Sequence, residues 1–531
     1  MTTLEQSGTG AGAGSALLSD GRIGTAVGAA VDWVTSTDHK KIGRLFTGFG
    51  ILGMIAVSVI AVLRSLESAA DLGAFNAQQL DQLTQLHHFG LALMVALPLT
   101  LGLSIAVAPM QVGARAIAFA RLALTGFYMW LAGSVLTIVA IVNGGGIGGA
   151  DSDMVDLFLA AMALMMFGVI ASAISVATTI LTSRAPGVTM RRVPFLTWTA
   201  LVQSLALIIT APVVVGLIIY LFVDHRNSAL AFGAADGLAD WLPRFFTVPV
   251  VYIFAIPALG VFAELLPVSM SRRHPMRQLV FTGAALVGVA SFAGVTMQRA
   301  FPVDFSESGQ DVVKSLVVMA FFVGLPLLGI AITLLTSLLV AKPDGSGAPK
   351  PRILSPLLFG LLSILLLLLG AVVGVLTQIV DLELRGTAAV EGTVALICLS
   401  AALGTLGGLV FWAPKFSGTK PDEKKVLPLA LLGALGVVLA GVPGVIAGLA
   451  DSDSSLFSTL TLIGYVLIAL TGLAFVGATR GGTSDGTNNP WCAHTLEWST
   501  ACPAPADNYE ALATVRSAEP ELDQLPEGSP S

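Results

Sequence analysis

The sequence predicts an all-α protein that crosses a membrane many times. Of its 531 residues, 55% are hydrophobic and 11% are charged, and the mean hydropathy is +0.85. An ordinary soluble domain carries about 25% charged residues. The apolar residues also occur in runs of roughly 20, the length that a helix needs to span a bilayer. The strands of a membrane barrel would alternate apolar and polar residues over about 10 positions, and these runs do not.

Twelve such runs predict twelve transmembrane helices. In chain order they cover residues 45–64, 86–109, 119–142, 154–182, 197–223, 245–270, 278–298, 315–340, 353–378, 386–413, 427–449 and 455–478. Residues 1–32 are rich in Gly, Ala and Ser and have no compact apolar core, so we expect a disordered tail and no signal peptide. The helices would then occupy residues 33–480, and a polar tail would occupy residues 481–531.

Positive charge predicts how the helices are oriented. Of the 27 Lys and Arg residues, 21 fall on one side of the predicted membrane and six on the other. Cytoplasmic loops are enriched in these residues, so we expect both termini in the cytoplasm of a bacterium, inside its plasma membrane. The outer loops are acidic and could dock a basic partner, although a solvated rim explains them equally well. Nothing in the composition suggests a nucleic-acid partner, and three cysteines are too few for a disulfide framework.

Few ionisable groups lie inside the predicted spans, and such groups tend to mark function because burying them in a bilayer is costly. Glu264 lies in the sixth span and Glu391 in the tenth, while His87 and His88 open the second. Glu264 could be a relay or a substrate site, or it could be a carboxyl group that is hydrogen-bonded to a neighbouring helix. Neighbouring helical residues point about 100° apart, so at most one of the two histidines readily faces the interior.

Five stretches, taken together, resemble the haem–copper oxidases, and specifically subunit I of cytochrome c oxidase. They occur in the order in which that family has them: STDHKKIGRLF (36–46), APMQVGARAIAFARL (108–122), PVVYIFAIPALGVFAELLP (249–267), FWAPKFSG (411–418) and NPWCAHTLEW (489–498). The resemblance implies the twelve-helix fold of that subunit, with both termini inside.

The family reduces oxygen at a haem that faces a copper ion, and a second haem supplies electrons. Six histidines hold these metals, for which neutral imidazole is a natural ligand. The resemblance places one of the six at His87, which makes it a candidate residual haem ligand. The family's copper-binding GHPEVYI reads TVPVVYI here, so Val248 replaces a copper ligand and Val250 replaces a proton-relay glutamate. Only Tyr252 of this motif's reactive groups remains.

The other ligand positions of the family have changed as well. Two further copper ligands correspond to Gln298 and Arg299, and a guanidinium cannot bind copper. The two haem-binding histidines of the tenth helix, in the family's HFHY motif, correspond to Gly392 and Val394.

The groups that assist the metals are missing too. The arginine pair that neutralises the haem propionates corresponds to Gly444 and Val445, and the family's proton-path residues have no counterpart. Five of the six ligating histidines are therefore absent. The predicted spans contain no histidine besides the pair at 87 and 88 that could replace them.

Three functions remain open from the sequence. The chain could be a non-catalytic structural or regulatory paralogue associated with the aerobic respiratory chain, with oxidase or cytochrome subunits as partners and lipid around it. It could be a haem-binding oxidase subunit that uses His87, or a transporter or channel that reuses the emptied cavities. We favour the first function, and we expect no copper, at most one haem and no catalytic residue, because so much of the ligand set is missing.

Overall fold

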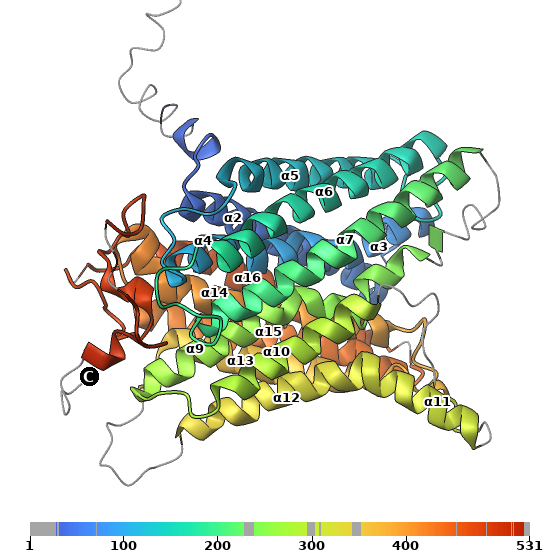
Figure 1. Ribbon diagram of the computed structural model, residues 1–531. Coiled ribbons are helices and arrows are strands. Elements are labelled where there is room, and N and C mark those ends of the chain that lie inside the picture. Colours follow the sequence, from blue (N-terminus) through green and yellow to red (C-terminus); the bar gives the residue numbers. More distant parts are fainter. Residues whose placement is uncertain are drawn as a thin grey trace, which may run out of the picture.

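The computed structural model describes residues 28, 31–70, 72–227, 238–239, 241–294, 303–306, 309–341, 352–452, 454–484, 486–510, 512 and 514–524. Within these ranges the chain is helical, and the only β pairing consists of two isolated bridges. The helices pack side by side as one bundle, and the C-terminal segment lies at one end of it (Figure 1). Almost all of the predicted disordered tail, residues 1–32, lies outside the described residues, as do Gln298 and Arg299.

Eleven helical spans in the described chain are long and apolar enough to cross a membrane. They are α2 (His39–Ala70), α3–α4 (Ala77–Gln111), α5 (Ala120–Val142), α6 (Ser152–Thr182), α7 (Phe195–Asn227), η3–α9 (Pro243–Met270), α11–η7 (Gln310–Ala341), α13 (Ser355–Leu376), α14 (Ala388–Ser417), α15 (Glu423–Leu449) and α16 (Ser455–Thr479). The predicted seventh span appears as the shorter apolar helix α10 (Arg277–Ala293), and residues 295–302 after it lie outside the described chain. The all-helical, multi-pass prediction is confirmed, and a count of twelve stays a prediction.

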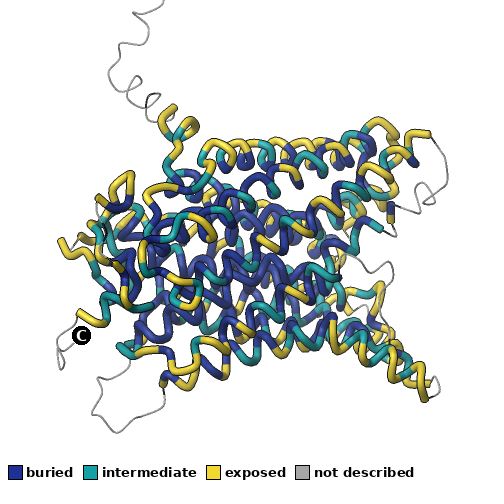
Figure 2. The backbone as a smooth tube through the Cα atoms, viewed as in Figure 1, coloured by how far each residue is buried: buried dark blue, intermediate teal, exposed yellow. Residues whose placement is uncertain are grey.

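Three spans form the centre of the bundle. The most apolar stretch is 100% buried in α3–α4, 94% in α14 and 89% in η3–α9, against 33% in α16. Figure 2 shows this buried interior enclosed by helices with exposed outer faces. A helix that is apolar on all sides, such as α4 or α9, has no polar face to present to solvent. These central spans hold four of the six ligand positions that the resemblance implies, namely His87, Val248, Gly392 and Val394.

Small residues let the late helices approach closely, as the glycine-rich sequence predicts. A side chain added at Gly392 of α14 would place its Cβ 2.4 Å from the carbonyl oxygen of Gly441 in α15. One added at Gly464 of α16 would lie 2.3 Å from the backbone nitrogen of Ala440. In both places the backbones of neighbouring helices are in direct contact.

Two central spans are not regular α-helices, which the sequence analysis did not predict. The second span contains a π-helical turn, η2 (Leu91–Ala96), between α3 (Ala77–Gly90) and α4 (Leu97–Gln111). The sixth begins as two 3₁₀ turns, η3 (Pro243–Phe246) and η4 (Val250–Ala255), and becomes α-helical only in α9 (Ile256–Met270). Prolines at 249 and 257 explain the second case, because proline has no N–H to donate to a preceding turn.

The C-terminal segment is packed onto the bundle. Lys40 at the start of α2 donates from Nζ to the carbonyl oxygen of Pro505 (3.0 Å) and to Oδ1 of Asn508 (3.1 Å). Lys415 at the end of α14 donates to the carbonyl oxygen of Thr500 at 2.7 Å. The hydroxyl of Tyr509 donates to the carbonyl oxygen of Met110 at 2.6 Å. We call this the docked end, and the opposite end of the bundle the pocket end.

Candidate functional site

A pocket of about 590 Å³ opens at the pocket end, between α2, α3, α14, α15 and α16. Its floor is buried and includes His87 of α3, Gly392 of α14 and Tyr465 of α16. Its rim includes the exposed residues Ser68 and Gly386. Ligand pockets commonly measure about 300–1,000 Å³, so this one has the size of a small-molecule site.

The histidine on the floor is held by a tyrosine. His87 is 1% exposed, and its Nε2 lies 2.7 Å from the hydroxyl oxygen of Tyr465, with the two rings edge to face. Its other ring nitrogen, Nδ1, has no hydrogen-bond partner among the described residues. Of the adjacent histidines, His87 is the one that faces this pocket, and His88 is not part of its lining.

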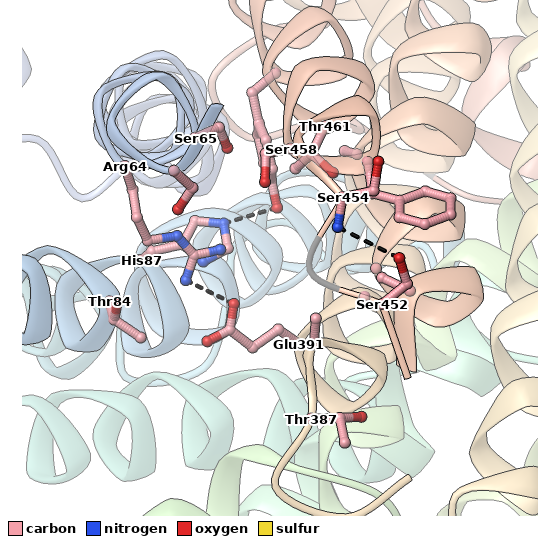
Figure 3. Close-up of a pocket in the computed structure, with 18 of the residues that line it drawn as sticks. Arg64, Ser65, Thr84, His87, Thr387, Glu391, Ser452, Ser454, Ser458 and Thr461 are labelled. Atoms are coloured by element: carbon pink, nitrogen blue, oxygen red, sulfur yellow. Dashed lines mark hydrogen bonds and ion pairs between the residues drawn. The ribbon is translucent and has the colours of Figure 1, made fainter. Parts of the chain in front are cut away.

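An ion pair crosses the pocket wall. Nη1 of Arg64 lies 2.6 Å from Oε2 of Glu391, and the side chains are 18% and 30% exposed. Figure 3 shows Arg64, His87 and Glu391 directed toward one another from three different helices. Glu391 was noted in the sequence as a charged residue inside a span, but its pairing with Arg64 was not predicted. Nothing in their positions, 327 residues apart along the chain, could have indicated it.

The structure brings some of the predicted site residues together and separates others. His87, Gly392 and Gly444 line the pocket, and Val445 lies beside them, with its Cγ2 3.3 Å from where a Cβ on Gly392 would be. Val394 is 1% exposed and is buried in the core. Gln298 and Arg299 are outside the described residues.

The TVPVVYI stretch lies apart from this pocket. Val250 and Tyr252 are buried in the helical core, and Val248 packs against it. A cavity beside Val250 measures about 20 Å³, which is room for about one water. The Tyr252 hydroxyl has no hydrogen-bond partner among the described residues, and it lies 2.6 Å from where a Cβ on Gly374 would be.

Glu264 accepts hydrogen bonds from the first backbone N–H groups of a neighbouring helix. Its Oε2 lies 2.8 Å from N of Phe195 and 3.4 Å from N of Leu196, at the start of α7. A carboxyl group at a helix N-terminus satisfies N–H groups that have no partner within the helix. Of the two alternatives for this residue, the geometry supports the hydrogen-bonded structural one.

Comparison with known proteins agrees with this architecture. The family model described as Cytochrome C and Quinol oxidase polypeptide I matches residues 41–478. The chain belongs to this family. This confirms the resemblance on which the positions of the missing ligands were based.

Bacterial relatives match over almost the whole chain. A protein named "Putative cytochrome c oxidase subunit 1-beta" from Streptomyces avermitilis is 28% identical, over 93% of this chain and 92% of its own. "Cytochrome c oxidase subunit 1" from Corynebacterium efficiens is 27% identical, over 92% of this chain and 88% of its own. This chain is therefore a multi-pass membrane protein similar to the first subunit of bacterial oxidases.

The residues present do not fit the metals that the family implies. The described chain contains no group of three or more His, Cys, Asp and Glu side chains that could hold a metal ion. In the TVPVVYI stretch, which corresponds to the family's copper-binding motif, Val248 and Val250 have no side-chain atoms that could bind a metal. At the pocket end, Nε2 of His87 is bonded to Tyr465, and the α14–α15 contact leaves no space for a larger side chain at Gly392.

Proposed function

We propose that this chain is a non-catalytic member of the family, which uses its helical scaffold as a structural or regulatory partner of the aerobic respiratory chain. It would bind no copper, and it would take up no haem at the family's ligand positions. Losing one residue that supports a metal ligand already lowers metal affinity or activity about 10- to 100-fold, and here the direct ligands themselves are replaced.

One observation carries this proposal: four of the five family-like stretches meet at the docked end. The side chain of Glu497 accepts hydrogen bonds from Nε1 of Trp412 at 2.9 Å and from Nε2 of Gln111 at 3.1 Å. Nε1 of Trp491 donates to the carbonyl oxygen of Phe411 at 2.8 Å. The stretch at 36–46 joins them through Arg44, which donates to the carbonyl oxygen of Phe416 at 3.5 Å.

Most of these contacts join buried side chains, so they support a structural role for the chain. The family-like residues are kept where the C-terminal segment forms one end of the molecule, and they have changed where the family binds its metals. A structural partner needs a stable scaffold, whereas an oxidase also needs its metal ligands. The partners we propose are oxidase or cytochrome subunits, and the surrounding lipid completes the environment.

The haem and copper content of the purified protein, together with its oxygen uptake, tests the proposal that the chain is non-catalytic. We would express the full chain beside a bacterial subunit I that carries all six ligating histidines, and purify both in the same detergent. Haem would be measured as the pyridine haemochrome, copper by mass spectrometry and oxygen uptake with reduced cytochrome c. We expect less than about 0.1 haem and copper per chain, and a positive control near full occupancy. Stoichiometric haem with oxygen uptake would overturn the proposal.

The partner role needs a separate test. Affinity purification in a mild detergent should recover oxidase or cytochrome subunits with the chain, and deletion of its gene should change respiration. A chain that migrates alone and whose deletion leaves oxygen consumption unchanged would contradict the role.

We also propose that both termini, and with them the docked end, face the cytoplasm. Basic residues such as Lys40, Arg184 and Lys415 lie at this end, as the rule for cytoplasmic loops requires. Alkaline phosphatase fused after residue 484 should be inactive, and the same enzyme inserted at residue 386 should be active. The reverse pattern would invert the orientation.

A further inference from the structure

The pocket at His87 has a lining unlike that of an ordinary apolar ligand site. Large apolar side chains usually dominate such sites. Here Leu80 and Phe457 are the only large aliphatic or phenyl side chains among the described lining residues. Eight serine and threonine residues share the wall instead: Ser65, Ser68, Thr84, Thr387, Ser452, Ser454, Ser458 and Thr461.

The hydroxyl groups come from several sides at helical spacing. Ser65 and Ser68 are three residues apart on α2, and Ser458 and Thr461 are three apart on α16, so each pair lies on one face of its helix. These four hydroxyls form no hydrogen bond with the described part of the protein. Each remains able to donate one hydrogen bond and accept others from a ligand.

The charge of the lining is balanced. Arg64 and Glu391 are the only Lys, Arg, Asp or Glu residues in it, and they neutralise each other at 2.6 Å. A charged or zwitterionic ligand would have to separate this pair. A neutral hydroxylated ligand would not, because the guanidinium has further N–H groups to donate and the carboxylate has lone pairs to accept.

The floor closes the site below the hydroxyls. The His87–Tyr465 pair is buried and internally bonded, and Nδ1 of His87 is buried without a partner in the described chain. The bonds to a ligand therefore come from the wall of the pocket. The Phe457 ring on the wall provides an apolar face for the C–H groups of a ring-shaped ligand.

We propose that this pocket binds a small, uncharged, polyhydroxylated ring, of the sugar or cyclitol class. Its hydroxyls bond to the Ser and Thr groups of α2 and α16, and the intact Arg64–Glu391 pair fixes its orientation from the wall. The ring is either a free molecule or the headgroup of a neutral glycolipid. This inference does not depend on the proposed function, because a ligand here requires no statement about respiration.

Binding to the purified full chain tests the proposal. The protein is prepared in a polyoxyethylene detergent, because maltoside headgroups are themselves sugars. Glucose, trehalose and myo-inositol are titrated by calorimetry, and glucosyl-diacylglycerol is supplied in nanodiscs as a second arm. We expect saturable binding in at least one arm, with a Kd tighter than about 5 mM for a free ring, and the arm that binds identifies the source.

A matched pair of variants locates the ligand. Thr461→Val removes a hydroxyl from the pocket wall and should weaken binding about tenfold, as the loss of one buried hydrogen bond does. Thr459→Val removes a hydroxyl two residues away that is exposed and bonded to the carbonyl oxygen of Ser455 at 2.8 Å, and should leave binding unchanged. Ser458→Ala serves as a second wall variant in case T461V is poorly folded.

Three results would overturn the proposal. Binding of glutamate or glycine betaine without any polyol would assign the pocket to zwitterions. A Soret band after addition of haemin, lost in His87→Ala, would assign it to haem. Failure of every polyol to bind in both arms would show that the pocket is not a site for this class.

Discussion

The polar groups of the docked end and of the pocket end differ in their burial and in their hydrogen bonds. At the docked end, Lys415 is fully buried and Glu497 is too, and both are bonded to groups from distant parts of the chain. At the pocket end, Arg64 and Glu391 are partly exposed, and the four wall hydroxyls on α2 and α16 have no partner in the described part of the chain. The docked end also has unpaired groups, such as both ring nitrogens of His494 and Nε1 of Trp498, but these atoms are buried. The unpaired hydroxyls of the pocket end line a cavity that a ligand could enter. The difference indicates that the docked end serves stability and that the pocket end can bond to another molecule.

The largest effect should follow from breaking the centre of the docked end. Glu497→Ala would leave Nε1 of Trp412 and the Gln111 amide buried without an acceptor. Each unsatisfied buried donor costs about 1–3 kcal/mol, so we expect a loss of roughly 3 kcal/mol in the free energy of unfolding.

Chemical unfolding in detergent micelles would measure this loss, with limited proteolysis of the C-terminal segment as a second readout. Glu497→Gln keeps an acceptor oxygen of the same shape and should recover most of the stability. Equal stability of E497A and the parent would mean that the docked end is not held by this residue.

A substitution at Gly392 tests whether the pocket end is loosely packed below its rim. The added Cβ of Gly392→Ala would lie 2.4 Å from a backbone oxygen of α15, which cannot move as a flexible side chain could. Overpacking of this kind costs about 1–3 kcal/mol, so we expect a loss near 2 kcal/mol.

Gly216→Ala in α7 is the matched control, because no atom lies within 4 Å of its added Cβ. It should be neutral, or stabilising by up to about 1 kcal/mol through helix propensity. A thermal midpoint that moves equally in both variants would show that the α14–α15 contact is not tight.

Acid should loosen the docked end through His494. Burial and, second, the positive charge of Arg273 lower the pKa of this histidine to about 4, from an ordinary value near 6.5. The unfolded segment therefore binds a proton between about pH 6.5 and 4 while the docked one does not, so stability falls as the pH falls through that window. The free energy of unfolding should fall by at most about 2 kcal/mol between pH 7 and pH 5.

The comparison with His494→Gln isolates this contribution. Burial raises the pKa of Glu519 and Glu521, which gives these two groups the opposite pH dependence, and both are present in parent and variant alike. Unfolding curves at pH 7 and pH 5 should show a smaller pH effect in H494Q. An unchanged pH effect would contradict the assignment.

The smallest effect is expected for the Arg64–Glu391 pair. Ion pairs that are partly exposed contribute about 0–1 kcal/mol, because solvent screens them. A double-mutant cycle with Arg64→Met and Glu391→Gln should therefore give a coupling energy below about 1 kcal/mol. A coupling above about 2 kcal/mol would make the pocket end as strongly bonded as the docked end and would remove the contrast between them.

Much of the fold could be predicted from the sequence because membrane spans are long and strongly apolar. Eleven of the predicted helices agree with the structure by length and composition. The position of His87 on an interior site was also predicted, through the family resemblance. What could not be predicted were the contacts between residues far apart in the chain, such as His87 with Tyr465 and Arg64 with Glu391.

The packing of the C-terminal segment is a second feature that depends on contacts between distant residues and could not be predicted. Its composition is polar, and on composition alone a tail of this kind reads as solvated. Yet Trp491 and Trp498 are each 1% exposed. Phe411, more than 70 residues earlier, provides the acceptor for Nε1 of Trp491 and a ring that contacts Trp498 edge to face. Whether residues 481–531 form a separate cytoplasmic tail stays a prediction, although most of those described are packed on the bundle.

The π-helical turn at Leu91–Ala96 sets the rotational phase of the second span. Such a turn accommodates one more residue than an α-helical turn, so the part of the span before it is rotated by about 100° relative to the part after it. α4 can therefore keep its packing in the core while Thr84 and His87 face α16. Deleting one residue from this turn would restore an unbroken helix and carry His87 away from Tyr465. The extra residue in this turn therefore determines which side chain of α3 faces the pocket.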